Sequence, residues 1–436
     1  MNSVASPQVP GPQRPPDAAA LSAADFDYEL PAELIAAEPA TQRDQSRLLV
    51  VSPAEPAEDV TVADGAIHLP TPSHDPTEIL WHERFADLPQ LISRHVGERT
   101  LIVLNDSKVL AARLYGHKHN PEGEPGGQVE FLLTEPMPTT PGSASARWRA
   151  LYRCSKPLRK GQLVRLHKRA ATDVPSHDVR VEEAEHGNAI LDLGPLSDEE
   201  FLALLSRLGE LPLPPYIENA RVRDGGQRSR QEDQIRYQTV FARSAGSVAA
   251  PTAGLHFTEA LLARLRDAGH ELAYVTLHVG PGTFLPLRSE RLEDHVMHSE
   301  RYQISAATAQ AIQTAKAQGR KVLAVGTTVV RTLEAAARAH GPATACPAPS
   351  GLATTQIFIY PPYRFAVVDA LLTNFHLPRS TLLMLVAAFA GRQRILAAYK
   401  EAVAQRYRFY SFGDAMLIPR VQGSAGHAEK DTSSRR

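Results

Sequence analysis

Two patterns of apolar and polar positions divide the chain. Between residues 113 and 213, short alternating runs such as Gln128–Leu133 and Arg147–Arg153 are separated by Gly, Pro, Asn and Asp. Alternation with period two, interrupted by turn residues, predicts several short strands in a small barrel or sandwich. On both sides, apolar runs of strand length alternate with segments of helical length, which predicts an α/β domain. The simplest architecture is one α/β domain that carries an inserted all-β module.

This division sets the expected domain bounds. We expect residues 25–112 and 214–421 to form the main α/β domain and residues 113–213 to form the inserted β-barrel domain. Residues 1–24, rich in Pro, Ala and Ser, are expected to be a disordered leader, and the polar residues 422–436 a disordered tail. A chain of 436 residues is long enough for this arrangement.

Three connecting segments have the composition of loops. The acidic, Pro-containing run Ser52–Pro76 predicts a surface loop. The segment Pro212–Tyr216 predicts a stiff, extended exit from the β module, because its prolines fix the backbone. The hydrophilic, Gly-containing segment Arg221–Arg236 predicts a mobile, net-basic loop.

The stretch Ser247–Leu287 offers the first place to look for chemistry. Its apolar runs Ser247–Ala250 and Leu272–Val279 have strand length, and a helix is expected between them, from Thr258 to about Gly269. This order predicts a right-handed βαβ unit. Each run is followed by a loop that carries a histidine beside glycines. Ligands bind beyond the carboxyl ends of strands in open α/β sheets, and both loops fall there.

A second junction lies near residue 326. The apolar run Lys321–Val325 predicts a strand, Gly326-Thr327-Thr328 a loop, and Val329–His340 a helix. Free N–H groups and the helix dipole make such a helix start a natural anion site. An ordinary helix start with no ligand is about equally compatible with this spacing, because the lysine of a phosphate-binding loop is missing.

Polar residues also crowd at a third junction. The segment Asn374–Thr381 contains Asn, His and Arg, and it precedes the apolar helix expected at Thr381–Ala390, with Ser380 as its N-cap. Polar residues beside a core are either functional or needed to satisfy backbone groups, and both interpretations stay open. Two aromatic segments with interleaved arginines, Tyr360–Phe365 and Tyr407–Asp414, could stack on bases or form corners of the core.

Composition is that of an ordinary globular protein, with 43% hydrophobic residues, 22% charged residues and a net charge of −1. A nucleic-acid partner would therefore need a local basic face.

The two cysteines, Cys154 and Cys346, lie far apart and form no metal or redox motif. We find no secretory signal, and the run Thr381–Ala390 is too short to span a bilayer. We therefore expect a cytoplasmic protein without a membrane partner.

A metal site is the alternative that the segment Glu293–Glu300 raises. It places His295 and His298 three residues apart, between carboxylates, and on a helix they would share a face. No complete ligand set accompanies them, so we expect no metal.

Several segments together resemble the family of S-adenosylmethionine:tRNA ribosyltransferase-isomerases. The likeness begins near residue 26 and recurs in one order to residue 418. Pro281 and Pro362 depart from the family pattern, and Pro281 leaves its local loop geometry in doubt. The similar segments are Phe26–Pro31, Ala250–Thr258, His278–Phe284, Met297-His298, Gly326–Thr328, Asp369–Pro378 and Phe412–Ile418.

This resemblance implies a fold and a reaction. The implied fold is an α/β main domain, a barrel-like mixed sheet with helices, with an inserted small all-β barrel. The family transfers and isomerises the ribosyl group of S-adenosylmethionine onto 7-aminomethyl-7-deazaguanine at the wobble position of a tRNA with a GUN anticodon. The product is epoxyqueuosine in tRNA, and adenine and methionine are released. S-adenosylmethionine is a co-substrate, no prosthetic group is implied, and we expect a monomer.

The resemblance also selects candidate residues, whose individual roles stay open. The catalytic candidates are His256, His278, His298, His376, Asp369 and Asp414. The candidates for binding S-adenosylmethionine are Thr252, Gly254, Gly280, Gly282, Thr283, Gly326, Thr327, Thr328 and Asn374. The candidates for binding tRNA are Arg43, Arg47, Lys108, Arg113, Arg331, Arg364 and Arg379, although each could instead form a surface salt bridge.

Two interpretations from other classes remain beside the transferase. A catalytically inert RNA-binding protein could retain the fold, although mere binding does not need the histidine and Gly-Thr loops. A metal hydrolase could use His295 and His298, and the metal content of the purified protein would identify it.

Overall fold

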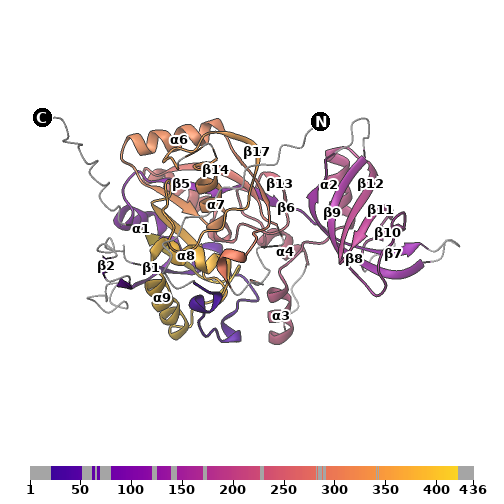
Figure 1. The fold of residues 1–436 in the computed structure, drawn as a ribbon, viewed down its shortest axis with the longest axis horizontal. Helices are drawn as coiled ribbons and strands as arrows, with labels where there is room; N and C mark the ends of the chain where they lie inside the picture. Colours follow the sequence, from indigo (N-terminus) through magenta and orange to yellow (C-terminus); the bar gives the residue numbers. More distant parts are fainter. Residues whose placement is uncertain are drawn as a thin grey trace, which may run out of the picture.

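We describe the protein from a computed structural model of all 436 residues. It describes residues 21–51, 61–63, 66–68, 80–119, 125–138, 145–169, 174–225, 230–280, 282, 287, 291–339, 341 and 343–420. An α/β part and a β-barrel lie side by side, with helices α3 (Pro215–Asp224) and α4 (Arg230–Arg236) near the junction (Figure 1).

A nine-stranded mixed sheet forms the centre of the α/β part, in the order β17-β15-β14-β5-β16-β18-β19-β1-β4. The four strands β14, β5, β16 and β18 are mutually parallel, as are β19 and β1, whereas the remaining neighbours pair antiparallel. The strands are β1 (Arg47–Val51), β4 (Leu80–Arg84), β5 (Leu101–Asn105), β14 (Glu271–His278), β15 (Glu300–Ile304), β16 (Val322–Val325), β17 (Ser350–Thr355), β18 (Ala370–Asn374) and β19 (Ala415–Pro419).

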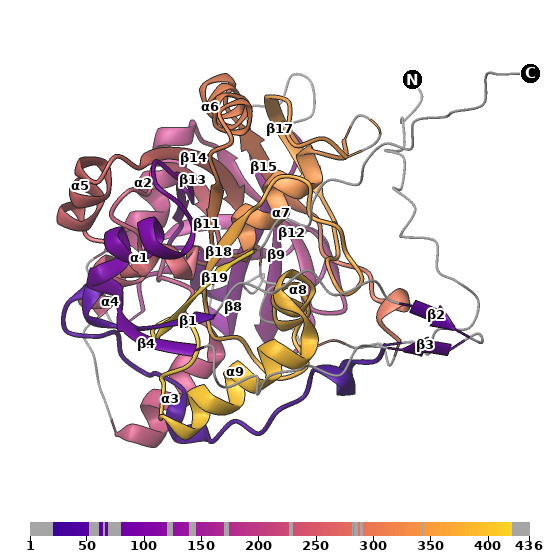
Figure 2. The ribbon, with the colours of Figure 1, turned by 90° about the vertical axis from the view of Figure 1, so that its left-hand side faces the viewer.

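Helices cover both faces of this sheet, because its central strands are apolar on both sides. In β5, Leu101 and Val103 face one core, while Ile102 and Leu104 face the other. Helices α1 and α5 pack on one face and α6 to α9 on the other (Figure 2). Their bounds are α1 (Leu88–His95), α5 (Glu259–Asp267), α6 (Ala306–Ala317), α7 (Thr327–Ala336), α8 (Thr381–Ala390) and α9 (Arg392–Ala404). Short 3₁₀ helices occupy Ala23–Phe26, Ala32–Leu34, Arg43–Gln45, Phe85–Asp87, Thr252–His256 and Leu292–Asp294.

The inserted module is a closed antiparallel barrel in the order β10-β11-β12-β9-β8-β7. Alternate residues of each strand fill its interior, as the sequence pattern predicts. Helix α2 (Asp198–Leu208) starts at a capping box of Ser197 and Glu200, and its Phe201 stacks on Trp148 at 4.8 Å. The barrel strands are β7 (Arg113–His119), β8 (Pro125–Pro136), β9 (Ser145–Cys154), β10 (Leu163–His167), β11 (His177–Glu185) and β12 (Asn188–Pro195). The predicted fold class is confirmed.

The predicted βαβ unit is wrong in its first strand. Strand β13 spans Ser244–Ser247 and pairs in parallel with β6 (Ser107–Val109), in a separate two-stranded sheet. Residues 248–250 are buried but extend no strand, because the chain turns at Pro251, which cannot donate a ladder hydrogen bond. The helix predicted between Thr258 and Gly269 is confirmed as α5, with the Thr258 hydroxyl accepting from the N–H of Leu261.

Two predicted loops contain helices. The predicted extended exit ends at α3, whose first residue is Pro215, since proline is favourable in the first helical turn. In the segment predicted as a mobile loop, Arg221 and Asp233 form a bidentate ion pair that joins α3 to α4. The surface loop predicted at Ser52–Pro76 contains a short hairpin of β2 (Thr61–Ala63) and β3 (Ala66–His68). The predicted tail lies outside the described residues, as do the first 20 residues of the predicted leader.

A test for membrane spans finds no candidate in any single helix of the described residues. Helices α8 and α9 pass the test of length and composition only as a pair, and this pair is bent by 115°.

Candidate active site

A cavity opens at the carboxyl ends of β16 and β18. These two strands are parallel neighbours, so the loops that follow them meet at one edge of the sheet. The space between the loops measures about 680 Å³, including solvent at its mouth. None of the lining residues is an Asp, Glu, Lys or Arg. The lining residues are Tyr216, Ala250, Pro251, Thr252, Ala253, Val279, Gly326, Thr327, Thr328, Thr373, Asn374, Phe375, His376, Leu377, Ser380, Leu382, Tyr410 and Ser411.

The start of helix α7 forms one wall of this cavity. Gly326 is the N-cap residue at φ 91°, a conformation that favours glycine, and no side chain caps the helix. The helix begins at Thr327, two residues before the predicted start. Its first N–H groups have no intrahelical acceptor, and Thr328 receives a hydrogen bond at 3.3 Å from the Asn105 amide. This wall can therefore donate to an anionic or carbonyl group.

The opposite wall follows β18 and contains Asn374 and His376. The Nε2 atom of His376 lies 2.9 Å from the hydroxyl oxygen of Thr373, and its backbone N–H donates to the Tyr399 hydroxyl. Burial lowers the pKa of His376 to about 3, so its imidazole is neutral at physiological pH. His376 is the only histidine among the residues that line the cavity.

His256 lies behind this wall, in contact with Asn374. Its Nε2 atom is 3.1 Å from the Asn374 amide nitrogen, and its Nδ1 atom is 2.7 Å from the Ser46 hydroxyl. Its ring stacks on Phe85 at 4.8 Å. Burial, reinforced by Arg408 and Arg43, lowers the pKa of His256 to about 3. His256 is therefore a neutral, fully hydrogen-bonded imidazole.

The other two histidine candidates are not among the lining residues. His278 ends β14 and packs against Gly246, where a side chain would approach the imidazole to 2.8 Å. Burial and Arg301 lower the pKa of His278 to about 4. His298 is exposed, and its ring covers Gly282 so closely that a side chain there would approach the ring to 2.3 Å.

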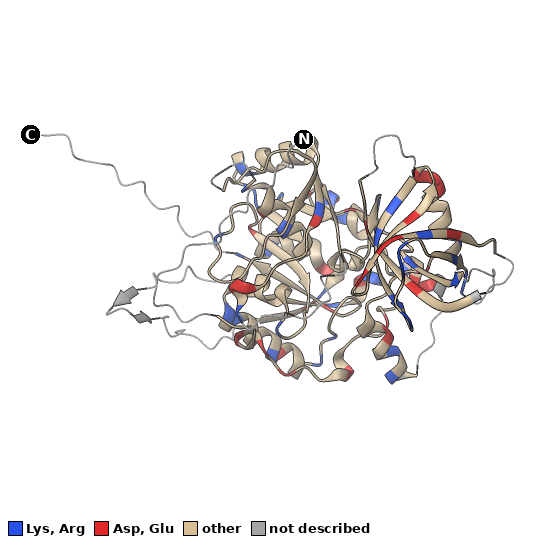
Figure 3. Ribbon diagram, turned by 45° about the vertical axis from the view of Figure 1, so that its right-hand side comes forward, with Lys and Arg blue, Asp and Glu red and all other residues tan. Residues whose placement is uncertain are grey.

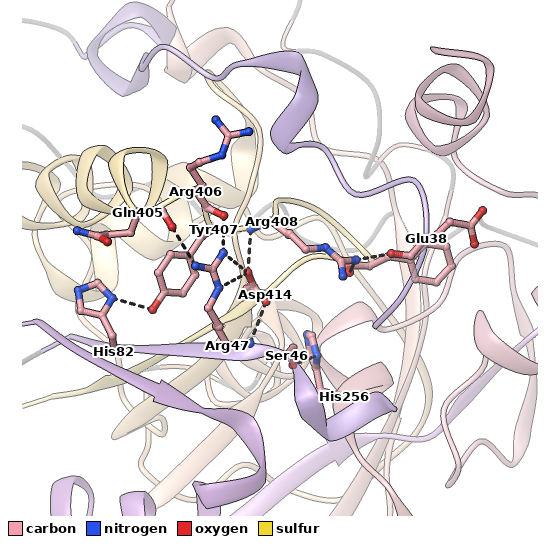
Figure 4. A network of polar contacts seen from close by, with 11 residues as sticks. Glu38, Ser46, Arg47, His82, His256, Gln405, Arg406, Tyr407, Arg408 and Asp414 are labelled. Atoms are coloured by element: carbon pink, nitrogen blue, oxygen red, sulfur yellow. Dashed lines mark hydrogen bonds and ion pairs between the residues drawn. The ribbon is translucent and has the colours of Figure 1, made fainter. Parts of the chain in front are cut away.

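The two carboxylate candidates are bound by protein groups. Asp369 precedes β18 at the end opposite Asn374, and accepts from Lys316 at 2.7 Å and from the Val322 N–H at 2.8 Å. Asp414 accepts from the backbone N–H groups of Arg47 (2.9 Å) and Arg408 (2.8 Å), and from the Arg47 guanidinium (Figure 4). These contacts give both carboxylates roles in holding segments together.

Of the candidates for binding S-adenosylmethionine, some line the cavity and others do not. Thr252, Gly326, Thr327, Thr328 and Asn374 line the cavity. Other glycines are placed by packing or by backbone contacts: a side chain at Gly254 would approach Thr239 and Phe241 to within 2.9 Å, and the Gly280 N–H donates to Glu300 at 3.3 Å. Gly282 lies under His298, and Thr283 lies outside the described residues.

Five of the seven basic candidates have protein partners. Arg43 donates to the carbonyls of Ile235, Arg236 and Leu255, and Arg331 is buried in an ion pair with Glu300. Arg47 pairs with Asp414, Arg113 with Glu218 and Arg379 with Asp27. Lys108 and Arg364 are exposed, and no side-chain partner is recorded for either among the described residues. Basic and acidic residues are interspersed over both parts of the molecule (Figure 3).

Sequence reasoning did not select Tyr216, Tyr410 and Ser411, which also line the cavity. Tyr410 has φ 72°, and its ring lies 4.5 Å from that of Tyr216, whose hydroxyl is bonded to Ser411. The segment Tyr407–Asp414 was compatible with base stacking or with an aromatic corner of the core, and its pattern does not reveal the positive φ of Tyr410.

The metal-hydrolase alternative lacks ligands in the described part of the chain. No group of three or more His, Cys, Asp or Glu side chains there could hold a metal ion. His295 packs its ring against Phe358 at 5.3 Å.

Comparisons with known proteins show which family the chain is similar to. A family model described as "Queuosine biosynthesis protein" matches residues 23–418. A protein of Anaeromyxobacter sp. (strain Fw109-5), named S-adenosylmethionine:tRNA ribosyltransferase-isomerase, is 47% identical over 397 residues, which cover 91% of this chain and 99% of that protein. A protein of Pelobacter propionicus with the same name is 48% identical over 394 residues, covering 90% and 98%. The crystal structure of S-adenosylmethionine tRNA ribosyltransferase from Thermotoga maritima matches with 33% identity and a TM-score of 0.44, covering 90% of this chain and 99% of that one.

Proposed function

The chain belongs to the queuosine biosynthesis protein family, and we propose that it is an S-adenosylmethionine:tRNA ribosyltransferase-isomerase. The observation that carries this proposal is the family match across residues 23–418, which includes every segment that lines the cavity. In the proposed reaction, the ribosyl group of S-adenosylmethionine is transferred to 7-aminomethyl-7-deazaguanine at the tRNA wobble position and isomerised. Epoxyqueuosine-tRNA is formed, and adenine and methionine leave.

The walls of the cavity support S-adenosylmethionine as its ligand. The sulfonium of this co-substrate acidifies the neighbouring ribose C–H, and adenine must leave, so the site needs groups that move protons. The N–H groups at the start of α7 suit a carboxylate or a ring nitrogen. Thr252, Thr327 and Thr328 add hydroxyl groups that can donate or accept.

We propose His376 as the residue that moves a proton in this cavity. It lines the cavity, and an imidazole ring carries one nitrogen that can accept a proton and one that can donate it. Thr373 holds the ring through Nε2, which leaves Nδ1 with no recorded hydrogen bond in the described structure. His278, His298, Asp369 and Asp414 are secondary candidates, because their recorded contacts lie outside the cavity.

The tRNA partner requires a second surface, for which we propose Lys108 and Arg364. Both cations are free of recorded carboxylate partners, so they can neutralise phosphates. The base to be modified must leave its stack to reach a cavity at the ends of the strands. We further propose that the substrate is a tRNA with a GUN anticodon, and that the enzyme acts in the cytoplasm as a monomer without a prosthetic group.

The deciding experiment supplies S-adenosylmethionine labelled in its ribose and tRNA that carries 7-aminomethyl-7-deazaguanine. We expect label in the tRNA and one adenine released for each label incorporated. His376→Ala should lower both signals, whereas Val296→Ala, at an exposed position outside the cavity, should lower neither. Retention of the tRNA without incorporation or adenine release would instead identify an inert RNA-binding protein.

A further inference from the structure

The side chain of Asn374 is held in one orientation. Its amide nitrogen lies 3.0 Å from the main-chain oxygen of Tyr410 and 3.1 Å from the Nε2 atom of His256. A carbonyl oxygen can only accept, so the atom that faces Tyr410 must be the amide nitrogen and cannot be the amide oxygen. Both N–H bonds of the carboxamide are therefore used within the protein. Asn374 has only its oxygen left to offer.

This orientation also fixes the tautomer of His256. Its Nε2 accepts from Asn374, so in the neutral ring the proton is on Nδ1, which donates to the Ser46 hydroxyl at 2.7 Å. His256 is 4% exposed and is not a lining residue of the cavity. Because both ring nitrogens are engaged away from the cavity, His256 acts through Asn374 and does not touch the ligand.

Two buried polar atoms of residues that line the cavity have no protein partner among the described residues. They are the Oδ1 atom of Asn374 and the hydroxyl of Tyr410, and both residues line the cavity. Asn374 is 2% exposed and Tyr410 is 6% exposed. A buried acceptor without a partner carries a free-energy cost, which a ligand that donates a hydrogen bond to it would remove. The φ of 72° at Tyr410 is a second local strain at this point.

We propose that Asn374 is the specificity-determining acceptor for an N–H donor of the substrate, and that His256 is the positioning residue that orients it. This inference rests on the proposed function. The exocyclic amine of the adenine ring is the donor that the cavity favours, because none of its lining residues is a carboxylate that would stabilise an ammonium group. The other N–H source in the same ligand is the ammonium group of its methionyl part.

Calorimetry with substrate analogues tests the role of Asn374. S-adenosylmethionine, its inosyl analogue and its analogue without the ammonium group are titrated into the protein alone and with tRNA. We expect the wild-type protein to bind the inosyl analogue about 10- to 100-fold more weakly, the usual effect of one unsatisfied hydrogen bond. Asn374→Leu should weaken S-adenosylmethionine by a similar factor and should no longer distinguish the inosyl analogue.

Each other result of this titration has a defined meaning. Unchanged affinity of Asn374→Leu for S-adenosylmethionine would overturn the inference. So would a result in which removing the ammonium group, and not replacing the adenine amine, weakens binding to the wild-type protein. If wild-type protein and variants bind as expected but no label enters tRNA, the transfer reaction of the proposed function fails, whereas the role of Asn374 in binding S-adenosylmethionine stands. Absence of S-adenosylmethionine binding by the wild-type protein in both conditions would overturn both.

Kinetics test the role of His256. We expect His256→Leu to raise the KM for S-adenosylmethionine at least about 5-fold, with the pH profile of kcat unchanged, because Asn374 loses an orienting partner and no proton-transfer group is lost. His256→Gln should restore the KM, since its amide oxygen can accept from Asn374. The matched control is His270→Leu, which removes an equally buried histidine outside the cavity and should leave the KM unchanged. A shifted pH profile in His256→Gln would overturn the positioning role.

Discussion

The Nε2 atom of His376 lies 2.9 Å from the hydroxyl oxygen of Thr373, which is three residues earlier and belongs to strand β18. Strand β18 ends between them, so the fixed end of the sheet positions the only histidine among the lining residues of the cavity. We infer that this contact orients the imidazole ring, because a hydrogen bond to one ring nitrogen of a histidine determines the role of the other nitrogen.

The first prediction concerns this contact. Thr373→Val keeps the shape of the side chain and removes the hydroxyl, so the ring of His376 loses its orienting partner. We expect adenine release to slow about 10-fold or more, the scale of one lost orienting hydrogen bond. Thr373→Ser should recover most of the rate. Equal rates for the Val and Ser variants would show that the hydroxyl does not orient the ring of His376.

Asn374 and His376 could be selected from the sequence, because they interrupt an otherwise apolar strand and helix. Tyr410 could not, because Tyr407, Phe409 and Tyr410 are all buried in one core cluster, and the sequence does not show the φ of 72° at Tyr410. The pattern predicted the barrel because four of its six strand pairings join consecutive strands, the exceptions being β12 with β9 and β10 with β7. Residues 248–250 were predicted to be part of a strand because they are apolar, and a short buried apolar segment has the same sequence pattern whether or not it pairs in a sheet.

The arginines show the same limit for charges. Arg379 pairs with Asp27, which lies 352 residues earlier, and Arg331 pairs with Glu300 across two elements. No local pattern contains these pairs. Sequence could therefore count the basic residues but could not tell which of them remain available to a phosphate.

The second prediction concerns stability below neutral pH. Burial lowers the pKa of His256 and of His376 to about 3, from about 6.5 in an unfolded chain. The unfolded state therefore binds more protons between these values, so the stability that is present above pH 6.5 is lost as pH falls. Each histidine should lower the free energy of unfolding by about 1.4 kcal/mol for each pH unit of acidification in this range, and the two together by roughly 3 kcal/mol. Urea unfolding at pH 7.0 and 5.5 measures the slope.

His256→Gln provides the control for this slope. Glutamine does not titrate, and His278, whose pKa burial lowers to about 4, contributes beside His376, so the variant should lose about a third of the pH dependence between pH 6.5 and 5. The lowered pKa values of Asp25 and Asp178 act only below about pH 4 and do not contribute in this window. A variant with the wild-type slope would contradict the assignment of a neutral, buried His256.

The third prediction separates a structural from a catalytic role for Asp414. Asp414 is 3% exposed and accepts from two backbone N–H groups and the Arg47 guanidinium (Figure 4). Asp414→Ala leaves these donors without a partner, so the free energy of unfolding should fall by about 3–5 kcal/mol. Glu401→Ala, which breaks only a 3.6 Å surface pair with His82, should cost less than about 1 kcal/mol. Loss of turnover in Asp414→Ala without loss of stability would return Asp414 to the catalytic candidates.

The fourth prediction concerns the surface that binds tRNA. Lys108 and Arg364 are exposed without recorded partners, whereas Arg379 is engaged by Asp27. Removing a cation that neutralises a phosphate lowers the slope of log affinity against log salt by about 0.7–0.9, so Lys108→Ala and Arg364→Ala should each show this change. Arg379→Ala is the matched control and should leave the slope unchanged, because its charge is already neutralised. Filter binding of tRNA from about 50 to 200 mM salt measures all three slopes. An unchanged slope in Lys108→Ala and Arg364→Ala would place the tRNA on another face of the molecule.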